Sequence, residues 1–363
     1  MRFTIKQAGC GSERVGCLTG FVKSINTVIE TPTSALFTQS GSVVHLTADV
    51  LLSVFTNPQL LWMPLSNTLP LETGVKAQGE GIVKFAGLPG QISCATSYNI
   101  NDGSPQGHFE QDRVPLWTKN GKQMINADRY MDVMEVFKPD LILAIADGRT
   151  SIAESKKRII KSVERTCKML ETCVARYKAS TNLQNMALAG ITDGTDDSYK
   201  VAEERLQSIF EKVGKTLPND LLRIVEGSWN PAVVLSAVEQ GWDIFDGSYP
   251  LKLTNAGHAL ALTFDVDQNN DELCIMDMND KRYKEDFNPI IKGCECLACR
   301  KHTRAYIRHL LNTREMLASV LLNIECVAGI NGISGAPDKT SSSKKKIKVS
   351  ATNNRLPDVV LKR

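Results

Sequence analysis

Three cysteines fall within six residues near the carboxyl end of the chain. Cys294, Cys296 and Cys299 follow the spacing C-x-C-x₂-C. Zn²⁺ binds three or four thiolate or imidazole ligands at tetrahedral corners, and short spacings let one turn supply several of them. A disulfide or three ordinary packed cysteines are the alternatives, but such clustering is rarely due to chance in a chain of 363 residues. The spacing therefore predicts a metal centre.

This run of cysteines does not fix the fourth ligand. His302 would extend the motif to C-x-C-x₂-C-x₂-H, whereas Glu325 or Cys326 would reach the metal from a helix that folds back over the cysteines. Zinc accepts carboxylate oxygen, although structural sites prefer Cys and His. Three thiolates from one turn, completed by a ligand on a packed helix, indicate a closed, structural site and not a catalytic one.

Two carboxylates stand at the ends of predicted strands. Asp246 ends the strand 242–246, and Asp147 has the same relative place at the end of 140–147. Barrels of parallel strands place reacting groups at the carboxyl ends of the strands, and two carboxylates can serve as nucleophile and general acid or base in glycosyl chemistry. The alternative is that both are turn residues, because each precedes glycine and Asp-Gly is a common turn dipeptide.

The elements that would position these groups alternate between helix and buried strand. Helices are predicted at 126–137, 151–177, 199–212 and 230–240, and strands at 140–147, 186–191, 222–227 and 242–246. In the clearest of these units Asn230 caps the helix, Pro231 is its first residue and Gly241 ends it. Repeated β-α-β units with short connections indicate a parallel sheet.

The first hundred residues are richer in short β-type runs, at 35–38, 42–46 and 82–86. The alternation alone does not distinguish a closed barrel from an open, doubly wound sheet, but the length suits an α/β fold of the (β/α)₈ TIM-barrel type with a zinc-binding insertion near the C-terminus. Three domains are predicted: the barrel with its β-rich N-terminal part at 1–283, the zinc-binding subdomain and its packing helix (303–324) at 284–330, and a basic, disordered tail at 331–363.

Composition is that of a soluble globular protein. The chain is 42% hydrophobic and 23% charged, with a net charge of +3. Residues 331–363 hold eight Lys or Arg and two Asp, so the tail carries +6 and the remainder carries −3. No uninterrupted apolar run is long enough for a membrane span, no secretory signal is apparent, and single, scattered cysteines fit a reducing compartment. We therefore expect a cytoplasmic protein.

Two motifs resemble those of a known family. The zinc motif Cys294-x-Cys296-x₂-Cys299 is followed by Thr303-Arg304-Ala305-Tyr306, and a strand upstream reads Gly241-x-Asp243-x-Phe245-Asp246. Together they resemble the tRNA-guanine transglycosylases, the queuine tRNA-ribosyltransferases, whose fold is a (β/α)₈ barrel. The resemblance covers about residues 1–330 and is strongest over 222–325. It implies that Asp246 occupies the position of the covalent nucleophile of active members.

The chain departs from this family where active members recognise the base. Four segments differ: 115–122 holds no Asp-Ser-Gly-Gly-Phe-Gln, Ile145-Ala146-Asp147 replaces Phe-Asp-Glu, 188–194 keeps part of Gly-Gly-Leu-x-x-Gly, and Pro250-Leu251-Lys252 replaces Pro-Thr-Arg. The base-recognising aspartate is therefore Ala146 here. A base-exchange enzyme must hold a purine edge and stabilise a glycosyl transition state, and Asp246 alone cannot do both.

The pattern resembles the non-catalytic, accessory-subunit branch of the family. It implies a chain with no catalytic residue, in which Asp246 is a vestigial nucleophile position. The implied partner is the catalytic subunit, which replaces guanine by queuine at the wobble position of GUN-anticodon tRNAs. The resemblance also implies one Zn²⁺ per subunit, and because the family's fourth ligand corresponds to Glu325, the ligand set would be Cys294, Cys296, Cys299 and Glu325.

Two other functions remain compatible with the sequence. An active transglycosylase would use Asp246 as nucleophile in a rebuilt pocket. A zinc-containing RNA-binding scaffold would act through the basic tail, whose lysines either contact RNA or only aid solubility. The sequence also leaves open a homodimer and a peripheral association with mitochondria.

Overall fold

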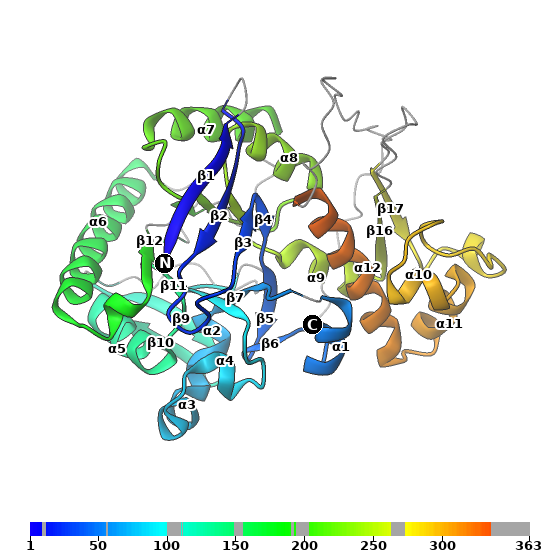
Figure 1. The fold of residues 1–363 in the computed structure, drawn as a ribbon, viewed down its shortest axis with the longest axis horizontal. Coiled ribbons are helices and arrows are strands. Elements are labelled where there is room, and N and C mark those ends of the chain that lie inside the picture. Colours follow the sequence, from blue (N-terminus) through cyan, green and yellow to red (C-terminus); the bar gives the residue numbers. More distant parts are fainter. Residues whose placement is uncertain are drawn as a thin grey trace.

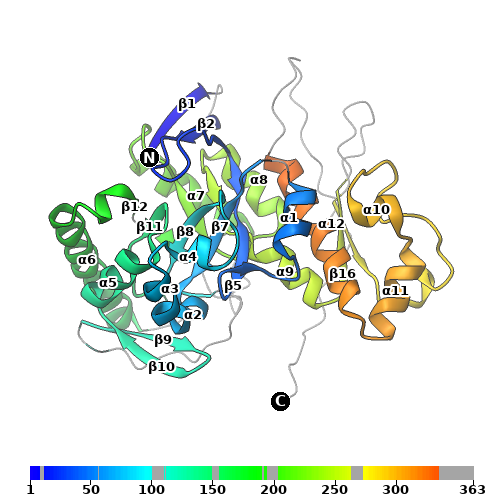
Figure 2. The same ribbon diagram turned by 60° about the horizontal axis from the view of Figure 1, so that its bottom comes forward.

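A computed structural model describes residues 1–8, 12–55, 57–99, 110, 112–148, 155–189, 192–193, 203–262 and 273–334. The segment 335–363, which makes up most of the predicted basic tail, lies outside the described residues. Parallel strands flanked by helices occupy the centre of the molecule, and a smaller helical subdomain lies at one side (Figures 1 and 2). Among the described helices, none is both long and apolar enough to cross a membrane.

The central strands form two hydrogen-bonded sheets. The larger has the order β12 (Ala187–Ala189), β11 (Leu141–Leu143), β8 (Ile92–Thr96), β7 (Leu60–Pro64), β5 (Leu36–Gln39) and β6 (Ser42–Val43). The smaller has the order β13 (Thr192–Asp193), β14 (Ile224–Glu226), β15 (Ile244–Phe245) and β4 (Thr33–Ser34). All pairs are parallel except β5 with β6. The predicted parallel α/β architecture is therefore confirmed.

The closed (β/α)₈ barrel is not detected among the described residues, because strand pairing stops at the edges of the two sheets. The sheets nevertheless meet along the chain at two places. Ala35 alone separates β4 from β5, and its N–H donates to Phe245 O of β15 at 2.9 Å. Two residues separate β12 of the larger sheet from β13 of the smaller one.

Helices and short 3₁₀ turns connect these strands. They are α1 (Ala48–Val54), α2 (Leu65–Thr68), η1 (Leu69–Leu71), α3 (Glu72–Gln78), α4 (Ile82–Phe85), α5 (Ala127–Phe137), α6 (Lys156–Ala179), η2 (Leu183–Asn185), α7 (Glu203–Thr216), α8 (Pro231–Glu239) and α9 (Ser248–Asn255). The predicted caps are present, because the side chains of Asn126 and Asn230 accept the backbone N–H of Arg129 and Val233, each at 2.9 Å. The β-type prediction at 82–86 is wrong. This segment is the single helical turn α4.

Alternate side chains of the central strands enter different cores. On β7, Leu61 and Met63 pack in one cluster of buried side chains, while Leu60 and Trp62 pack in another. Strands buried on both faces read as continuous apolar runs, which is why 140–147 was recognisable in the sequence. The second cluster also contains Ile224 of β14 and Ile244 of β15, so side chains from both sheets share it.

Two antiparallel units lie outside the parallel sheets. The N-terminal strands β1 (Arg2–Ala8), β2 (Arg14–Thr19) and β3 (Ile29–Thr31) form a three-stranded sheet. A separate hairpin joins β9 (Val114–Thr118) to β10 (Gly121–Ile125).

The C-terminal subdomain has its own apolar cluster. The elements that contribute to this subdomain are β16 (His258–Leu262), β17 (Leu273–Asp277), η3 (Lys281–Tyr283), α10 (Leu297–Lys301), α11 (Arg304–Asn312) and α12 (Met316–Ser334). The single helix expected over 303–324 is wrong. The helix is interrupted between α11 and α12, where Arg314 has a positive φ of 57°. Helix α12 lies between the subdomain and the parallel strands (Figures 1 and 2).

Candidate metal centre and remnant of a catalytic site

The three cysteines of the C-x-C-x₂-C run converge with one carboxylate. Cys296 is the N-cap of α10, Cys299 lies in its first turn and Cys294 precedes it. Glu325 comes from α12 and is 1% exposed. The ligand atoms of these four side chains all lie within 4.8 Å of one another. One ion can therefore be reached by all four.

Short polar contacts connect the members of this group. The Sγ atoms of Cys296 and Cys299 lie 2.9 and 3.0 Å from Glu325 Oε2. Backbone N–H groups point at the sulfurs: Ile291 donates to Cys299 Sγ at 3.3 Å, and Cys299 donates to Cys296 Sγ at 3.4 Å. Such donors stabilise thiolates, which are the form that binds a metal.

The two alternative ligands lie outside the group. His302 stacks on Tyr306, with ring centroids 5.2 Å apart. Cys326 is fully buried in a different apolar cluster with Leu260, and its Sγ lies 3.8 Å from His258 O. Although Cys326 is adjacent to Glu325, the two side chains leave α12 in different directions, so only one of them faces the cysteines.

A cation bound between these four side chains would stabilise their ionised forms. Burial raises the pKa of Glu325 to about 8 and that of Cys294 to about 11. The pKa of Cys296 is lowered to about 5, chiefly by hydrogen bonding with Cys299. Four acidic groups this close cannot all be ionised without a positive charge between them. Three thiolates and a carboxylate fit Zn²⁺, which takes S, N and O ligands in fours.

Asp246 follows β15 and is almost completely buried, with 2% exposure. Its Oδ1 accepts the backbone N–H of Ser248 at 2.7 Å, while its Oδ2 has no hydrogen-bond partner among the described residues. Burial raises its pKa to about 7, against the opposing effect of the bond from Ser248. A nucleophilic carboxylate must be ionised, whereas burial here shifts this carboxyl toward its protonated form.

The raised pKa of Asp246 predicts a pH dependence of stability. Because the folded protein holds this proton up to about pH 7 and the unfolded chain releases it near pH 3.8, the group stabilises the fold fully below about pH 4 and loses that contribution as pH rises to about 7. Asp246→Asn removes this term. Relative to wild type, we expect the variant to gain up to about 4 kcal/mol between pH 4 and pH 8.

Urea unfolding at several pH values measures this difference, since titrations shared by the two proteins cancel. A gap between variant and wild type that stays constant from pH 4 to pH 8 would contradict the assignment.

Asp147, the second predicted carboxylate, is held by two arginines of α6. Arg158 binds it through both guanidinium nitrogens at 2.8 and 2.9 Å, and Arg165 forms a second ion pair with the same carboxylate. The Asp147 side chain has no exposed area. The two guanidinium groups bind this carboxylate and orient it toward α6. It therefore ties a helix to a strand end.

Sequence reasoning missed two further groups at these strand ends. Glu226, the last residue of β14, is 2% exposed and accepts a hydrogen bond from Thr96 Oγ1 of β8 at 2.5 Å. Tyr98 donates from its hydroxyl to Ala146 O at 3.1 Å. The available signal for Glu226 was its place at the end of a predicted strand, the same signal that singled out Asp246.

The segments in which the sequence departs from the family pattern lie in different parts of the fold. Residues 115–122 belong to the β9–β10 hairpin, which pairs with no parallel strand among the described residues. The strand that lies between β7 and β11 is β8, and it continues into Thr96-Ser97-Tyr98-Asn99. Of the partial loop 188–194, residues 190, 191 and 194 lie outside the described part, and Pro250-Leu251-Lys252 lies in α9.

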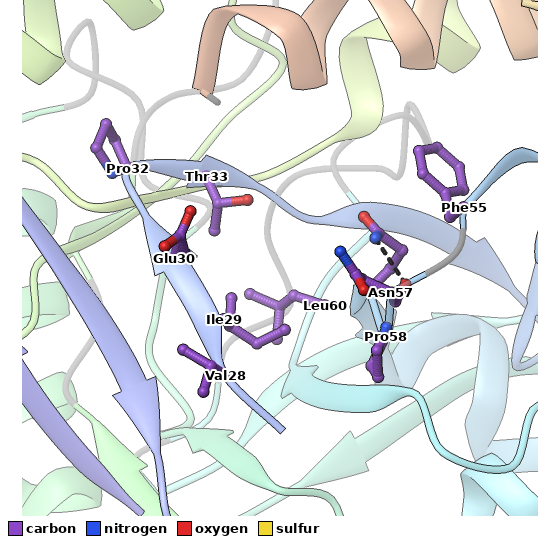
Figure 3. A pocket seen from close by; sticks show the side chains of 10 residues that line it. Val28, Ile29, Glu30, Pro32, Thr33, Phe55, Asn57, Pro58 and Leu60 are labelled. Atoms are coloured by element: carbon purple, nitrogen blue, oxygen red, sulfur yellow. Dashed lines mark hydrogen bonds between the residues drawn. The ribbon is translucent and has the colours of Figure 1, made fainter. Parts of the chain in front are cut away.

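A separate cavity of about 320 Å³ opens at the other end of the strands, where β4 and β7 begin (Figure 3). Its described lining consists of Val28, Ile29, Glu30, Pro32, Thr33, Phe55, Asn57, Pro58, Gln59 and Leu60. Glu30 pairs with Lys6, the Nζ atom lying 3.1 Å from Oε1. None of the residues predicted for the metal centre or the catalytic remnant is in this lining.

Comparison with known proteins identifies a matching family and several relatives. The family model described as Queuine tRNA-ribosyltransferase matches residues 10–204 and 197–330. The chain is 34% identical over 360 residues to "Queuine tRNA-ribosyltransferase accessory subunit 2" of Anopheles gambiae, with 89% of this chain and 83% of the relative covered. Proteins of the same name from Danio rerio and Homo sapiens are 29% and 28% identical, covering 88% and 85% of this chain and 90% and 89% of the relatives. The chain belongs to the queuine tRNA-ribosyltransferase family.

Proposed function

We propose that this chain is the non-catalytic accessory subunit of a queuine tRNA-ribosyltransferase. It would pair with the catalytic subunit that exchanges guanine for queuine at the wobble position of GUN-anticodon tRNAs. The observation that carries the proposal is the state of the two strand-end carboxylates. Asp147 is bound by two arginines, and Asp246 is buried in a site that shifts it toward its protonated form. The names of the relatives support the same function.

The chain lacks particular groups that base exchange requires. Base exchange at a ribose needs an ionised nucleophile, a proton donor or acceptor for the leaving base, and polar groups that hold the purine edge. Here the base-recognising position is Ala146, whose carbonyl oxygen is engaged by Tyr98. The buried hydrogen bond between Thr96 and Glu226 ties the ends of β8 and β14 together. These residues stabilise the strand ends and leave Asp246 without an assisting group.

For the fold we propose one barrel of the (β/α)₈ type built from both sheets. The segments 33–39 and 187–193 would carry the chain from one sheet to the other, since each contributes a strand to both. The shared cluster supports this arrangement, because Leu60, Leu141, Ile224 and Ile244 come from four strands of the two sheets. Side chains that fill a small barrel pack in this way.

For the metal centre we propose one Zn²⁺ per subunit, held by Cys294, Cys296, Cys299 and Glu325. Zinc there would act as a structural cross-link, because four protein ligands leave no open position for substrate or water. The ligands connect α10 to α12, and α12 also packs against β16, α9 and β4. The ion would therefore fix the subdomain against the parallel strands. A cytoplasmic location fits reduced cysteines of this kind.

An exchange assay tests the proposed function directly. Purified chain is incubated with labelled guanine or queuine and a GUN-anticodon tRNA, with and without the catalytic subunit. We expect no incorporation by the chain alone, and incorporation when the catalytic subunit is added. Asp246→Asn in the accessory chain should leave that rate within about twofold, because the carboxyl is not used.

The second candidate function, an active transglycosylase, predicts the opposite outcome. Its supporting observation is that Asp246 is retained at the end of β15. Incorporation by the chain alone, abolished in Asp246→Asn, would establish that function and refute the accessory one. A third outcome concerns the basic tail. If truncation at Ala336 abolishes tRNA binding while the heterodimer persists, the chain acts as an RNA-binding scaffold.

A further inference from the structure

Helix α6 is the longest described helix, with 24 residues or about 36 Å. Only three of its side chains are buried: Ser162, Met169 and Cys173. The inner face is nevertheless firmly attached. Arg158 and Arg165 bind Asp147, and Arg176 binds Asp128 and Asp132 at 3.2 and 2.6 Å. The helix lies at one edge of the molecule, on the side opposite the zinc-binding subdomain (Figures 1 and 2).

The outer face of α6 carries an apolar stripe. Ile160, Val163 and Leu170 are 48%, 57% and 36% exposed, and Cys167 between them is exposed as well. The spacing of three, four and three residues is that of the a and d positions of a coiled-coil heptad. Exposed aliphatic side chains are unremarkable singly, but three of them in one line with a cysteine on a rigid helix form a seam. The seam matches the apolar face of another helix.

The charges beside the seam indicate which helix that is. Lys157, Glu164 and Glu171 are all exposed and recur every seven residues, which places them at the e positions along one edge of the seam. The g positions on the other edge, Ile159, Thr166 and Cys173, are uncharged, and Cys173 is buried. In a parallel pair, e faces g, so these charges would meet no partner. In an antiparallel pair, e faces e.

An antiparallel second copy of α6 completes both the seam and the charges. When Ile160 faces Leu170 of the second copy and Val163 faces its Cys167, Lys157 lies opposite Glu171 of the other chain. Two-fold symmetry repeats each of these contacts. The only like-charged contact at the e positions is Glu164 with its own copy at the axis. The stripe is therefore close to self-complementary in shape and charge.

We propose that this chain self-associates through α6, as an antiparallel two-helix contact about a two-fold axis near Glu164 and Arg165. The proposal does not depend on the accessory function, and the zinc-binding subdomain remains free on the opposite side. A contact of about three heptads buries on the order of 1,000 Å², at the low end for specific interfaces. We expect a dimer with a dissociation constant on the order of 10 µM.

Sedimentation equilibrium of the full chain from about 1 to 100 µM tests the seam. Val163→Glu should raise the dimer dissociation constant at least about tenfold, because it buries a charge in the apolar contact on each copy. Leu221→Glu is the matched control, since Leu221 is 55% exposed and lies outside α6. It should leave the constant within about twofold. Thermal unfolding of each variant shows whether its fold is intact.

Charge exchange tests the antiparallel register. Lys157→Glu and Glu171→Lys should each weaken the dimer about fivefold, by turning two attractive contacts into repulsive ones. The double variant restores both pairs and should return to within about twofold of wild type. Glu164→Gln removes the like-charged contact at the axis and should strengthen the dimer about threefold. A structural role of these side chains within one chain would not produce this rescue.

Three outcomes overturn the proposal. One is a wild-type chain that stays monomeric at 100 µM, and another is a dimer unaffected by Val163→Glu. The third is a lipid surface as the occupant of the stripe. In that case a monomeric wild type would sediment with phosphatidylcholine vesicles containing phosphatidylserine, and Val163→Glu would not. Failure of the exchange assay above leaves all of these results unchanged, so the two proposals stand or fall separately.

Discussion

Cys299→Ser is expected to lose the bound zinc and to lower the midpoint of thermal unfolding by at least about 10 °C. Wild-type protein should contain one zinc per chain by mass spectrometry of the metal. Removal of one thiolate leaves two cysteines and Glu325, too few ligands for a structural site. Glu325 is 1% exposed, so loss of the ion also leaves a buried carboxyl that must hold a proton.

Three variants distinguish the proposed fourth ligand from the two alternative ligands. Glu325→Gln should weaken zinc retention against a chelator about tenfold to a hundredfold, because an amide oxygen replaces a carboxylate. Cys326→Ser and His302→Ala should retain the metal, since neither residue lies in the ligand group. The ligand set would be wrong if Cys326→Ser lost the metal while Glu325→Gln kept it.

The expected loss of thermal stability on removal of zinc follows from the position of α12. Ile324 and Val327 of this helix pack with the core of the larger sheet, Leu321 and Leu322 with the core of the subdomain, and Cys326 with a third cluster beside β16. Three apolar surfaces thus meet on one helix, and Glu325 is the residue that connects it to the cysteines. A structural ion there would stabilise the contact between two parts of the chain.

The sequence predicts local features of this site better than long-range ones. The cysteine spacing, the Asn126 and Asn230 caps and the buried strands each depend on residues close in the chain, and the structure contains them. The break between α11 and α12 was missed because apolar spacing continues through it. The choice between Glu325 and Cys326 depends on the rotation of α12, which distant packing decides.

The role of Asp147 was open in the sequence for a similar reason. Its environment comes from Arg158 and Arg165, seven residues apart and therefore on one face of α6. That shared face can be derived from the sequence. What cannot be derived is that the face turns toward the end of β11, since this depends on how the helix packs against the sheet. Pairing of the carboxylate with these two arginines is a tertiary property.

The first half of the motif Gly241-x-Asp243-x-Phe245-Asp246 has a structural role. Gly241 has a positive φ of 79°, and a Cβ there would lie 2.4 Å from Ser12 O. Glycine is therefore required both for the backbone conformation and for the close approach of Ser12. Asp243 is fully buried and binds Arg14 of β2, with Arg14 Nε 2.9 Å from Oδ1. The first half of the motif therefore attaches the N-terminal sheet to β15 through Asp243 and Arg14, whether or not Asp246 has a catalytic role.

Asp243→Ala is expected to destabilise the fold by about 3–5 kcal/mol, the usual cost of leaving a buried charge without its partner. Arg14 is 6% exposed, and besides Asp243 it donates to Asn219 O and Leu221 O at 2.6 and 2.7 Å. These neutral acceptors position the guanidinium group but do not neutralise it. The backbone N–H of Arg223, 2.7 Å from Asp243 Oδ2, also loses its acceptor. Urea unfolding measures the change.

A double-mutant cycle distinguishes the pair from simple loss of packing. Arg14→Met alone should cost less than Asp243→Ala, because Asp243 keeps the N–H of Arg223 as a donor. The combination Arg14→Met with Asp243→Ala should cost less than the sum of the two single changes, since no charge is then left buried alone. If the double variant instead shows the sum of the two single costs, the ion pair contributes nothing of its own. The motif would then be retained for Gly241 alone, and the attachment of the N-terminal sheet would depend on backbone packing at Ser12.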